Sequence, residues 1–287
     1  MRPAWYLPWG LVLPIALHAQ APSNNPAQNL NPQGASQPNS NPPDSLQAAA
    51  SQAENQIVPL SQEPHHRLVL QNDFTRVYNV MVAPLDATLP HTHDLPYVAV
   101  SLGPANVVNL VVGKPAARMV LQDGQVTYSD GGFTHLVGTD SGIPFHDVTV
   151  ELVKPQGTAR NLCEQIVPGP LGACPQRTEV VAGKRNAPEA ADDDIPYFET
   201  DGARVDVIKV ATGKDYIEES PKLNGLLIAL TNANLDVNLG GQHISFLHDG
   251  DILWMPAGTH RRVVDFLGTR SSFLLVSFTD SAGAAKP

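Results

Sequence analysis

The chain of 287 residues contains few cysteines and few basic residues. Two cysteines are too few for a thiolate zinc cluster or for a scaffold held by several disulfides. Lys and Arg total 18 against 28 Asp and Glu, and the formal net charge of −10 leaves no basic stripe that could neutralise a phosphate backbone. We therefore expect no nucleic-acid partner.

Charged residues and long apolar runs are also scarce. Only 16% of the residues are charged, whereas 42% are hydrophobic, and 26 Pro and 22 Gly interrupt the chain. This composition favours short strands joined by turns, in ~two domains with real cores. No segment after the N-terminus reaches the ~18 uninterrupted apolar residues that a membrane span requires. The motifs of serine hydrolases, phosphate-binding loops and dinucleotide-binding folds are absent.

The N-terminus has the pattern of a secretory signal peptide. Arg2 precedes an apolar run over residues 4–17, and small residues at Ala19 and Ala21 offer two cleavage sites. A permanent anchor is the weaker alternative, because proline and glycine interrupt the run. We expect an exported protein, periplasmic or secreted, with no membrane span after signal removal.

Two blocks of strand-like runs follow a Pro-, Asn- and Gln-rich segment that cannot bury enough apolar surface to fold. The first block contains runs at 67–71, 74–83, 97–102, 107–112, 118–121, 126–128 and 145–153. The second contains runs at 204–210, 226–231, 235–239, 243–247, 252–255, 262–266 and 272–278. Asp123-Gly124 and Gly240-Gly241 predict hairpin turns. The similar lengths of the blocks indicate an internal duplication.

These observations predict six segments. They are a signal peptide (1–21), a disordered linker (22–62), a first barrel (63–155), a second linker (156–194), a second barrel (195–280) and a tail (281–287). Cys163 and Cys174 lie in the second linker. Because an exported chain meets an oxidising compartment, we expect them to form a disulfide, although two unrelated thiols remain the alternative.

The histidines of the first block carry the clearest chemical signal. His91 and His93 are two residues apart, so in a strand both imidazoles point to one face. His135 follows a turn-rich Asp130-Gly131-Gly132 and begins another extended segment. Three neutral imidazoles would form a site for divalent iron, manganese, zinc, nickel or copper. The alternative is a trio that only bonds backbone carbonyls.

This arrangement resembles the cupin family of small β-barrels. Gly124, five residues, Asp130-Gly131-Gly132, two residues, His135, three residues and Thr139 reproduce the spacing of its second motif. His91 and His93 match the His-X-His of its first motif, whose glutamate position falls on Tyr97 or Val98. The resemblance implies an all-β chain of two antiparallel, jelly-roll-like barrels and a three-histidine metal site of the kind that some dioxygenases of the family use.

The second block resembles the same family with less of its chemistry. Gly250 and the segment Pro256 to His260 follow the second motif with one residue missing, and Glu219-Ser220-Pro221 stands where His-X-His is expected. We therefore expect a degenerate barrel without a metal site. Arg261 and Arg262 indicate that its histidine lies at a solvated rim.

The places of five further residues follow from strand parity or from their position in the chain. Alternation places Tyr97 on the face of the histidines, where we expect it to pack; a phenolate ligand or a hydrogen-bond partner of the substrate are the alternatives. His146 shares the parity of Val148, Val150 and Leu152, which we expect to face the barrel interior as a candidate pocket residue. Asp94 has the opposite parity and should face solvent. The tandem His65-His66 should be exposed.

Two kinds of function are consistent with this sequence. The first is a metal-dependent small-molecule enzyme, such as a dioxygenase. The second is a non-catalytic binding or structural protein that retains the pocket, with the long linker holding the barrels away from a cell envelope. Both imply a small-molecule ligand, and the resemblance is compatible with a homodimer.

Overall fold

The computed structural model describes residues 57–168, 171, 192–210, 215–218, 221–239, 242–264 and 271–279. Within these ranges the regular structure is β-strand apart from one 3-10 turn, η1 (Leu60–Gln62), so the all-β prediction is confirmed. The predicted signal peptide and Cys174 lie outside the described residues. The export signal and the Cys163–Cys174 disulfide therefore stay predictions.

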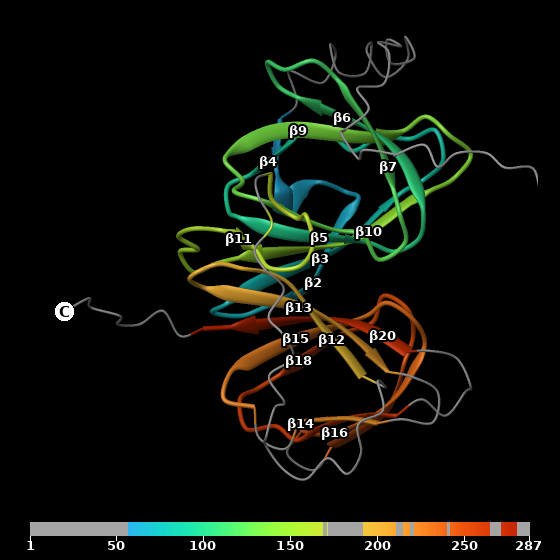
Figure 1. Ribbon diagram of the computed structural model, residues 1–287. Helices are drawn as coiled ribbons and strands as arrows, with labels where there is room; N and C mark the ends of the chain where they lie inside the picture. Colours follow the sequence, from blue (N-terminus) through green and yellow to red (C-terminus); the bar gives the residue numbers. More distant parts are fainter. Residues whose placement is uncertain are drawn as a thin grey trace, which may run out of the picture. The chain divides into compact units, whose positions relative to one another are not determined.

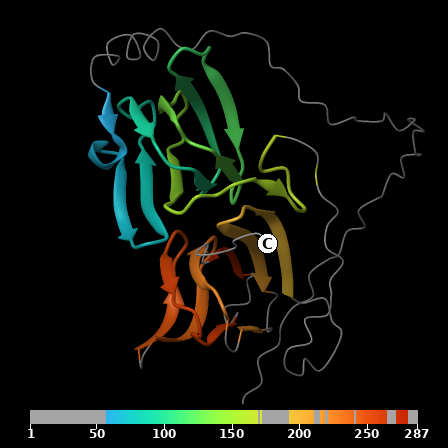
Figure 2. The same cartoon turned by 90° about the vertical axis from the view of Figure 1, so that its left-hand side faces the viewer.

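The first barrel consists of two five-stranded sheets that face each other (Figures 1 and 2). One sheet has the order β1 (Val58–Pro59), β4 (His91–His93), β9 (Phe133–Thr139), β6 (Ala105–Val111) and β7 (Ala117–Leu121). The other has the order β2 (His66–Gln71), β3 (Thr75–Val82), β10 (Phe145–Leu152), β5 (Tyr97–Ser101) and β8 (Val126–Ser129). Their pairings are antiparallel except that of β1 with β4.

One predicted hairpin is wrong. The strands that flank Asp123-Gly124 lie in opposite sheets, because β7 pairs with β6 and β8 pairs with β5. The turn crosses from one sheet to the other, and the Gly124 amide donates to the Ser101 carbonyl at 2.8 Å. A turn signal between two strand-like runs therefore does not by itself determine which strands pair.

The second barrel repeats the arrangement with a six-stranded and a four-stranded sheet. The larger sheet has the order β11 (Arg160–Asn161), β12 (Asp192–Glu199), β13 (Ala203–Val210), β20 (Ser271–Phe278), β15 (Asn224–Ala229) and β18 (Ile252–Met255). The smaller has the order β14 (Asp215–Glu218), β19 (Arg261–Val264), β16 (Ala233–Leu239) and β17 (Gln242–Leu247). The second predicted hairpin is confirmed, because Leu239 of β16 pairs with Gln242 of β17.

Strand alternation on β10 separates two buried faces. Phe145 packs with Tyr78 and other residues inside the first barrel. Val148 and Val150, of the opposite parity, pack in one core with Phe198 and further residues of the second barrel. The apolar parity of β10 therefore faces the second barrel, and the expectation that this face is the barrel interior is wrong. β-Branched residues suit such a strand, which is buried on both faces.

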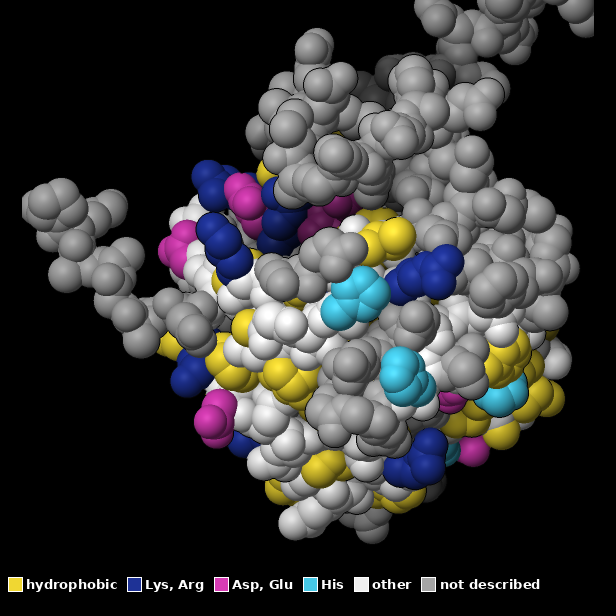
Figure 3. Space-filling model, turned by 90° about the horizontal axis from the view of Figure 1, so that it is seen from below, with side chains coloured by type: hydrophobic (Ala, Val, Ile, Leu, Met, Phe, Trp, Pro, Cys, Tyr) yellow, Lys and Arg dark blue, Asp and Glu magenta, His cyan; other side chains and the backbone are white. Residues whose placement is uncertain are grey.

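Among the described residues no helix is long and apolar enough to cross a membrane. Figure 3 shows one face of the surface, on which several of the described Lys and Arg side chains lie beside Asp and Glu at the upper left and the others lie singly.

Candidate metal centre

The three histidines predicted from the motif spacing meet in the first barrel. Strands β4 and β9 are neighbours, and His91 lies directly opposite His135 in their register. The ring centroids of His91 and His93 are 5.0 Å apart, and that of His135 lies 4.6 and 5.1 Å from them. All three side chains are buried. The structure thus brings together imidazoles that are more than forty residues apart in sequence.

A fourth histidine, His66, joins the cluster from β2. Its ring centroid lies 4.5 Å from that of His91, and the ligand nitrogens of His66, His91 and His93 lie within 4.8 Å of one another. The expectation that His66 is exposed is wrong, because pairing with Val80 of β3 places it on the interior face. The sequence offered one signal for His66: an acid, Glu63, lies three residues before it, and acids often orient metal-binding imidazoles.

Hydrogen bonds hold three of the rings in defined orientations. His91 Nδ1 donates to the Leu89 carbonyl at 2.8 Å. His66 Nδ1 donates to Glu63 Oε2 at 2.6 Å, and His135 Nδ1 lies 2.9 Å from the Asn109 amide oxygen. Because Nδ1 carries the proton in such bonds, Nε2 keeps its lone pair for another partner.

The ring nitrogens of His66, His91 and His93 lie close enough together to share an ion, whereas His135 is not in this group and joins the cluster by its ring position. His91 Nε2 and His93 Nε2 are 3.2 Å apart. Two nitrogens that bind one zinc ion at ~2.1 Å lie about 3.0–3.4 Å from each other for angles between octahedral and tetrahedral values. His135 Nε2 is buried and lacks a hydrogen-bond partner among the described residues. Since an unpaired buried nitrogen costs free energy, the donor set fits a borderline-soft divalent transition ion.

Burial keeps these imidazoles neutral. Burial, together with the positive charge that His66 would carry, lowers the pKa of His91 to about 4. Burial and the neighbouring histidines lower the pKa of His93 to about 3 and that of His135 to about 2. Neutral imidazole is the form that binds a metal ion.

Glu63 is the buried carboxylate of the site. It accepts hydrogen bonds from His66 Nδ1 at 2.6 Å, His65 Nδ1 at 2.9 Å and the Leu89 amide at 3.0 Å. Burial raises its pKa, but the bonds from His66 and His65 outweigh burial and lower it to about 2. An ionised carboxylate behind a histidine fixes the ring and makes it a more basic ligand.

Tyr97 packs on the cluster, as its parity predicted. Its ring stacks on His93 with centroids 4.3 Å apart and planes at 29°. Burial raises its pKa to about 12, so the hydroxyl is a neutral phenol, which bonds to Ser129. Tyr97 therefore supports the orientation of His93.

His146 is not part of this arrangement. It lies on the face of β10 that packs against the second barrel, where its Cε1 atom is 3.7 Å from the position that a Cβ atom on Gly250 would take. Burial lowers its pKa, and its Nε2 atom is buried. Asp94 is exposed, as expected from its parity.

No known family profile and no curated protein matches the sequence. Solved structures do match. AerE from Microcystis aeruginosa aligns with a TM-score of 0.54 and 10% identity over 77% of this chain and 95% of that chain. A salicylate 1,2-dioxygenase from Pseudaminobacter salicylatoxidans aligns with a TM-score of 0.51 and 15% identity over 81% and 80%. At these identities the likeness shows the fold alone, and the two-barrel cupin fold expected from the motifs is confirmed.

Proposed function

We propose that this two-barrel cupin protein binds one divalent transition metal ion in its first barrel and acts on a small organic molecule there. His91, His93 and His135 supply three ligands, and His66 supplies a fourth. The observation that supports this proposal best is the 3.2 Å separation of the His91 and His93 Nε2 atoms, together with the buried His135 Nε2 atom, which has no hydrogen-bond partner among the described residues.

The protein's own residues prepare the site. Glu63 and the Leu89 carbonyl hold the Nδ1 protons of His66 and His91, so their Nε2 lone pairs point inward. Tyr97 covers one face of His93 and excludes water from it. A bound transition ion supplies Lewis-acid or redox chemistry to an oxygen or sulfur donor of the substrate.

The structural likeness supports one substrate class to test. The salicylate dioxygenase that shares the fold has been solved as adducts with gentisate. Hydroxylated aromatic acids carry paired oxygen donors, which suit a metal with open positions. We propose this class as the first to test, with dioxygen as co-substrate, and we propose that the protein works after export.

Metal content and oxygen consumption of the His93→Ala variant test this function. We expect wild-type protein to carry about one iron or manganese per chain and to consume oxygen with gentisate or salicylate, and His93→Ala to lose both. His248→Ala, at an exposed turn of the second barrel, is the matched control and should keep both. Turnover that survives in metal-free His93→Ala protein would exclude the mechanism.

A non-catalytic binding protein is the second candidate. It is favoured by the burial of the cluster, in which His91 and His93 are 0 and 2% exposed. In that case the same measurement gives substoichiometric metal, or a full complement of metal without oxygen consumption.

A further inference from the structure

The sheet that carries His91, His93 and His135 has a second face, which points away from the barrel interior. Asn109 of β6 points inward, because its amide oxygen bonds to His135, so its neighbours Val108 and Leu110 point outward. On β9 the outward residue next to His135 is Leu136, which pairs with Leu110. Val108 is 0% exposed and Leu136 is 4% exposed. The outward face is therefore apolar and shielded from water at its centre.

No described element accounts for this shielding. The facing sheet of the barrel lies on the inward side, where Val107 packs with Tyr78, and the second barrel packs against the other sheet. Val108 and Leu136 belong to none of the hydrophobic clusters that the described residues form. Apolar side chains in the middle of an open sheet face are normally exposed unless another element packs on them.

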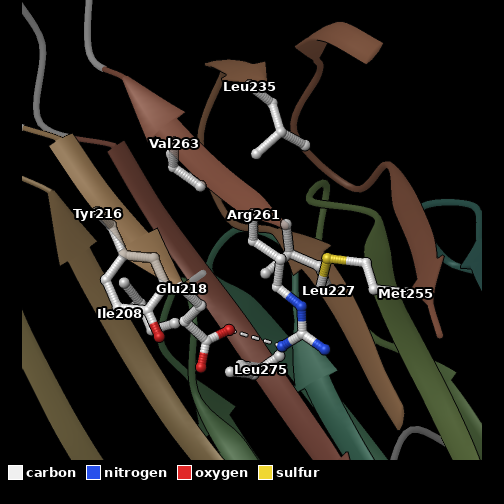
Figure 4. A pocket seen from close by; sticks show the side chains of 9 residues that line it. All are labelled: Ile208, Tyr216, Glu218, Leu227, Leu235, Met255, Arg261, Val263 and Leu275. Carbon is white, nitrogen blue, oxygen red and sulfur yellow. Dashed lines mark hydrogen bonds and ion pairs between the residues drawn. The ribbon is translucent and has the colours of Figure 1, made fainter. Parts of the chain in front are cut away.

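The smaller sheet of the second barrel offers a comparison within the same chain. Figure 4 shows its inward side chains, among them Tyr216 and Val263, around the ion pair of Arg261 with Glu218. The expectation that Arg261 lies at a solvated rim is wrong, because the residue points inward and is 3% exposed. Its Nη1 atom donates to Glu218 Oε2 at 2.7 Å.

The outward face of that smaller sheet has the pattern of an uncovered surface. Ile217 of β14 and Phe246 of β17 point outward and are 41% and 37% exposed. At the centre of the face the outward residues include the polar Asn234 and Arg262. The first barrel differs in both respects, because its central outward residues are apolar and are buried.

The chain enters the first barrel at the edge of the shielded sheet. Strand β1 pairs with β4, so the residues that precede Ile57 start beside the outward face. Strands β1 and β6 are three strand spacings apart, about 14 Å at ~4.8 Å per spacing. Residues 45–56 as a helix are about 18 Å long at ~1.5 Å per residue. This segment is long enough to cross the sheet from β1 to β6.

The sequence of this segment has the pattern of an amphipathic helix. Apolar residues follow the i, i+3, i+4, i+7 spacing, at Leu46, Ala49, Ala50 and Ala53. Asp44 is a favoured N-cap residue, and Gln47 stands three positions later, as in a capping box. A helix of this length is marginal in water by itself and needs a surface on which to bury its apolar stripe.

We propose that residues 45–56, which lie outside the described part of the chain, dock as an amphipathic helix on the outward face of β9 and β6. The apolar stripe rests on Val108, Leu110 and Leu136, and its alanines allow a close approach to the sheet. The predicted linker then ends near residue 44, and the docked helix supports the strands that carry the histidines from behind. This inference does not depend on the metal or on the function proposed above.

Hydrogen exchange of the full-length protein, followed by mass spectrometry, tests the proposal. We expect the amides of residues 48–56 to exchange at least ~tenfold more slowly than in a synthetic peptide of the same sequence. Ala50→Asp places a charge in the apolar stripe and should abolish this protection. Ala48→Asp is the matched control, because the same substitution costs the same helix propensity but lies on the opposite side of the helix. It should keep the protection.

A second pair of variants tests the sheet side of the contact. Leu110→Asp should also abolish the protection of residues 48–56, because it places a charge on the surface that receives the helix. Val120→Asp is its control and should keep the protection, because Val120 lies on the edge strand β7 and is already 69% exposed. Circular dichroism establishes that each variant is folded. If Leu110→Asp does not fold, the comparison of Ala50→Asp with Ala48→Asp decides.

Three results would overturn the proposal. The first is exchange of residues 48–56 in wild type as fast as in the peptide. The second is equal protection in Ala50→Asp and Ala48→Asp, or full protection in folded Leu110→Asp. The third is a dimer in sedimentation velocity that Leu110→Asp dissociates and Ala50→Asp leaves intact, because a second copy of the chain would then occupy this face.

Discussion

At the scale of single residues, Glu63 determines how His66 is presented to the cluster. The carboxylate is buried and ionised, and its bond to His66 Nδ1 is 2.6 Å long. We expect Glu63→Gln to lower metal affinity ~10–100-fold, because loss of an acid that orients a ligand typically costs that much. Dissociation constants from chelator competition measure it.

Asp86→Asn is the matched control for this variant. Asp86 contacts His65 Nε2 at 3.4 Å and does not bond to His66. Its replacement should leave metal affinity within about twofold of wild type. Equal affinities for wild type and Glu63→Gln would show that His66 is not a ligand that Glu63 orients.

Asp147 is a second buried carboxyl group, on the interior face of β10. Burial raises its pKa to about 7, against which the Thr149 hydroxyl bond acts only weakly, and its Oδ1 atom has no hydrogen-bond partner. Since the folded state binds the proton more tightly than the unfolded chain, Asp147 lowers stability as the pH rises from about 4 to about 7. Below about pH 4 the Asp147 carboxyl is protonated in both the folded and the unfolded protein, so this loss of stability is absent there.

Asp147→Asn removes this pH dependence. We expect the variant to gain stability relative to wild type between pH 4 and pH 8, by up to about 4 kcal/mol for a shift of about three pKa units. Urea unfolding at both pH values measures the difference. A constant difference between the two proteins across this range would show that Asp147 has an ordinary pKa in the folded state.

At the scale of elements, the two glycines before β9 differ in how much space a side chain would have at each position. Gly131 and Gly132 both have positive φ, at 69° and 72°. A Cβ atom on Gly131 would press against the Leu95 carbonyl, 2.7 Å from its carbon, whereas one on Gly132 would meet nothing within 4 Å. The turn that leads into His135 therefore depends on the first glycine for space and on both for backbone conformation.

Gly131→Ala should displace this turn and Gly132→Ala should not. We expect Gly132→Ala to cost ~1 kcal/mol from backbone strain and to keep metal content. Gly131→Ala should cost several-fold more and reduce metal content, because the entry to β9 must shift. Urea unfolding and elemental analysis measure both effects. Equal losses of stability in the two variants would contradict the role of the Leu95 contact.

Most strands, and the three histidines whose rings lie together in the first barrel, were predictable from the sequence. Alternation located most strands to within a few residues, and motif spacing identified His91, His93 and His135. His66 was not found, because its place in the cluster depends on the pairing of β2 with β3, which is not a local property. The burial of Arg261 was missed for a similar reason, since its partner Glu218 is 43 residues away. Local sequence patterns predict which face of a strand a side chain lies on. Strand pairing, which is not local, determines which side chains then come into contact.

At the scale of the whole molecule, the two barrels share one hydrophobic core. Phe198 of β12 is fully buried in it, with its ring centroid 5.2 Å from that of Tyr128 in the first barrel. Phe74 and Trp254 form another contact across the same core, at 5.8 Å. A core shared in this way couples the unfolding of both barrels.

Phe198→Ala should therefore destabilise both barrels together, by ~3–5 kcal/mol. Trp254 is the only tryptophan beyond residue 21, so its fluorescence reports on the shared core, while far-UV circular dichroism reports on all strands. We expect both signals to shift to one lower midpoint in urea. Phe246→Ala, at a 37% exposed position, is the control. Two separate transitions in the variant would show that the barrels unfold independently.

The antiparallel strand pairs β4–β9 and β14–β19 carry different inward-facing side chains. The β4–β9 pair carries imidazoles in the first barrel, and the β14–β19 pair carries the Arg261–Glu218 ion pair in the second. Features that both barrels share belong to the architecture, whereas the side chains that differ are not required by it. Exchanging residues between the two strand pairs would therefore show how few side chains convert a histidine cluster into an ion pair.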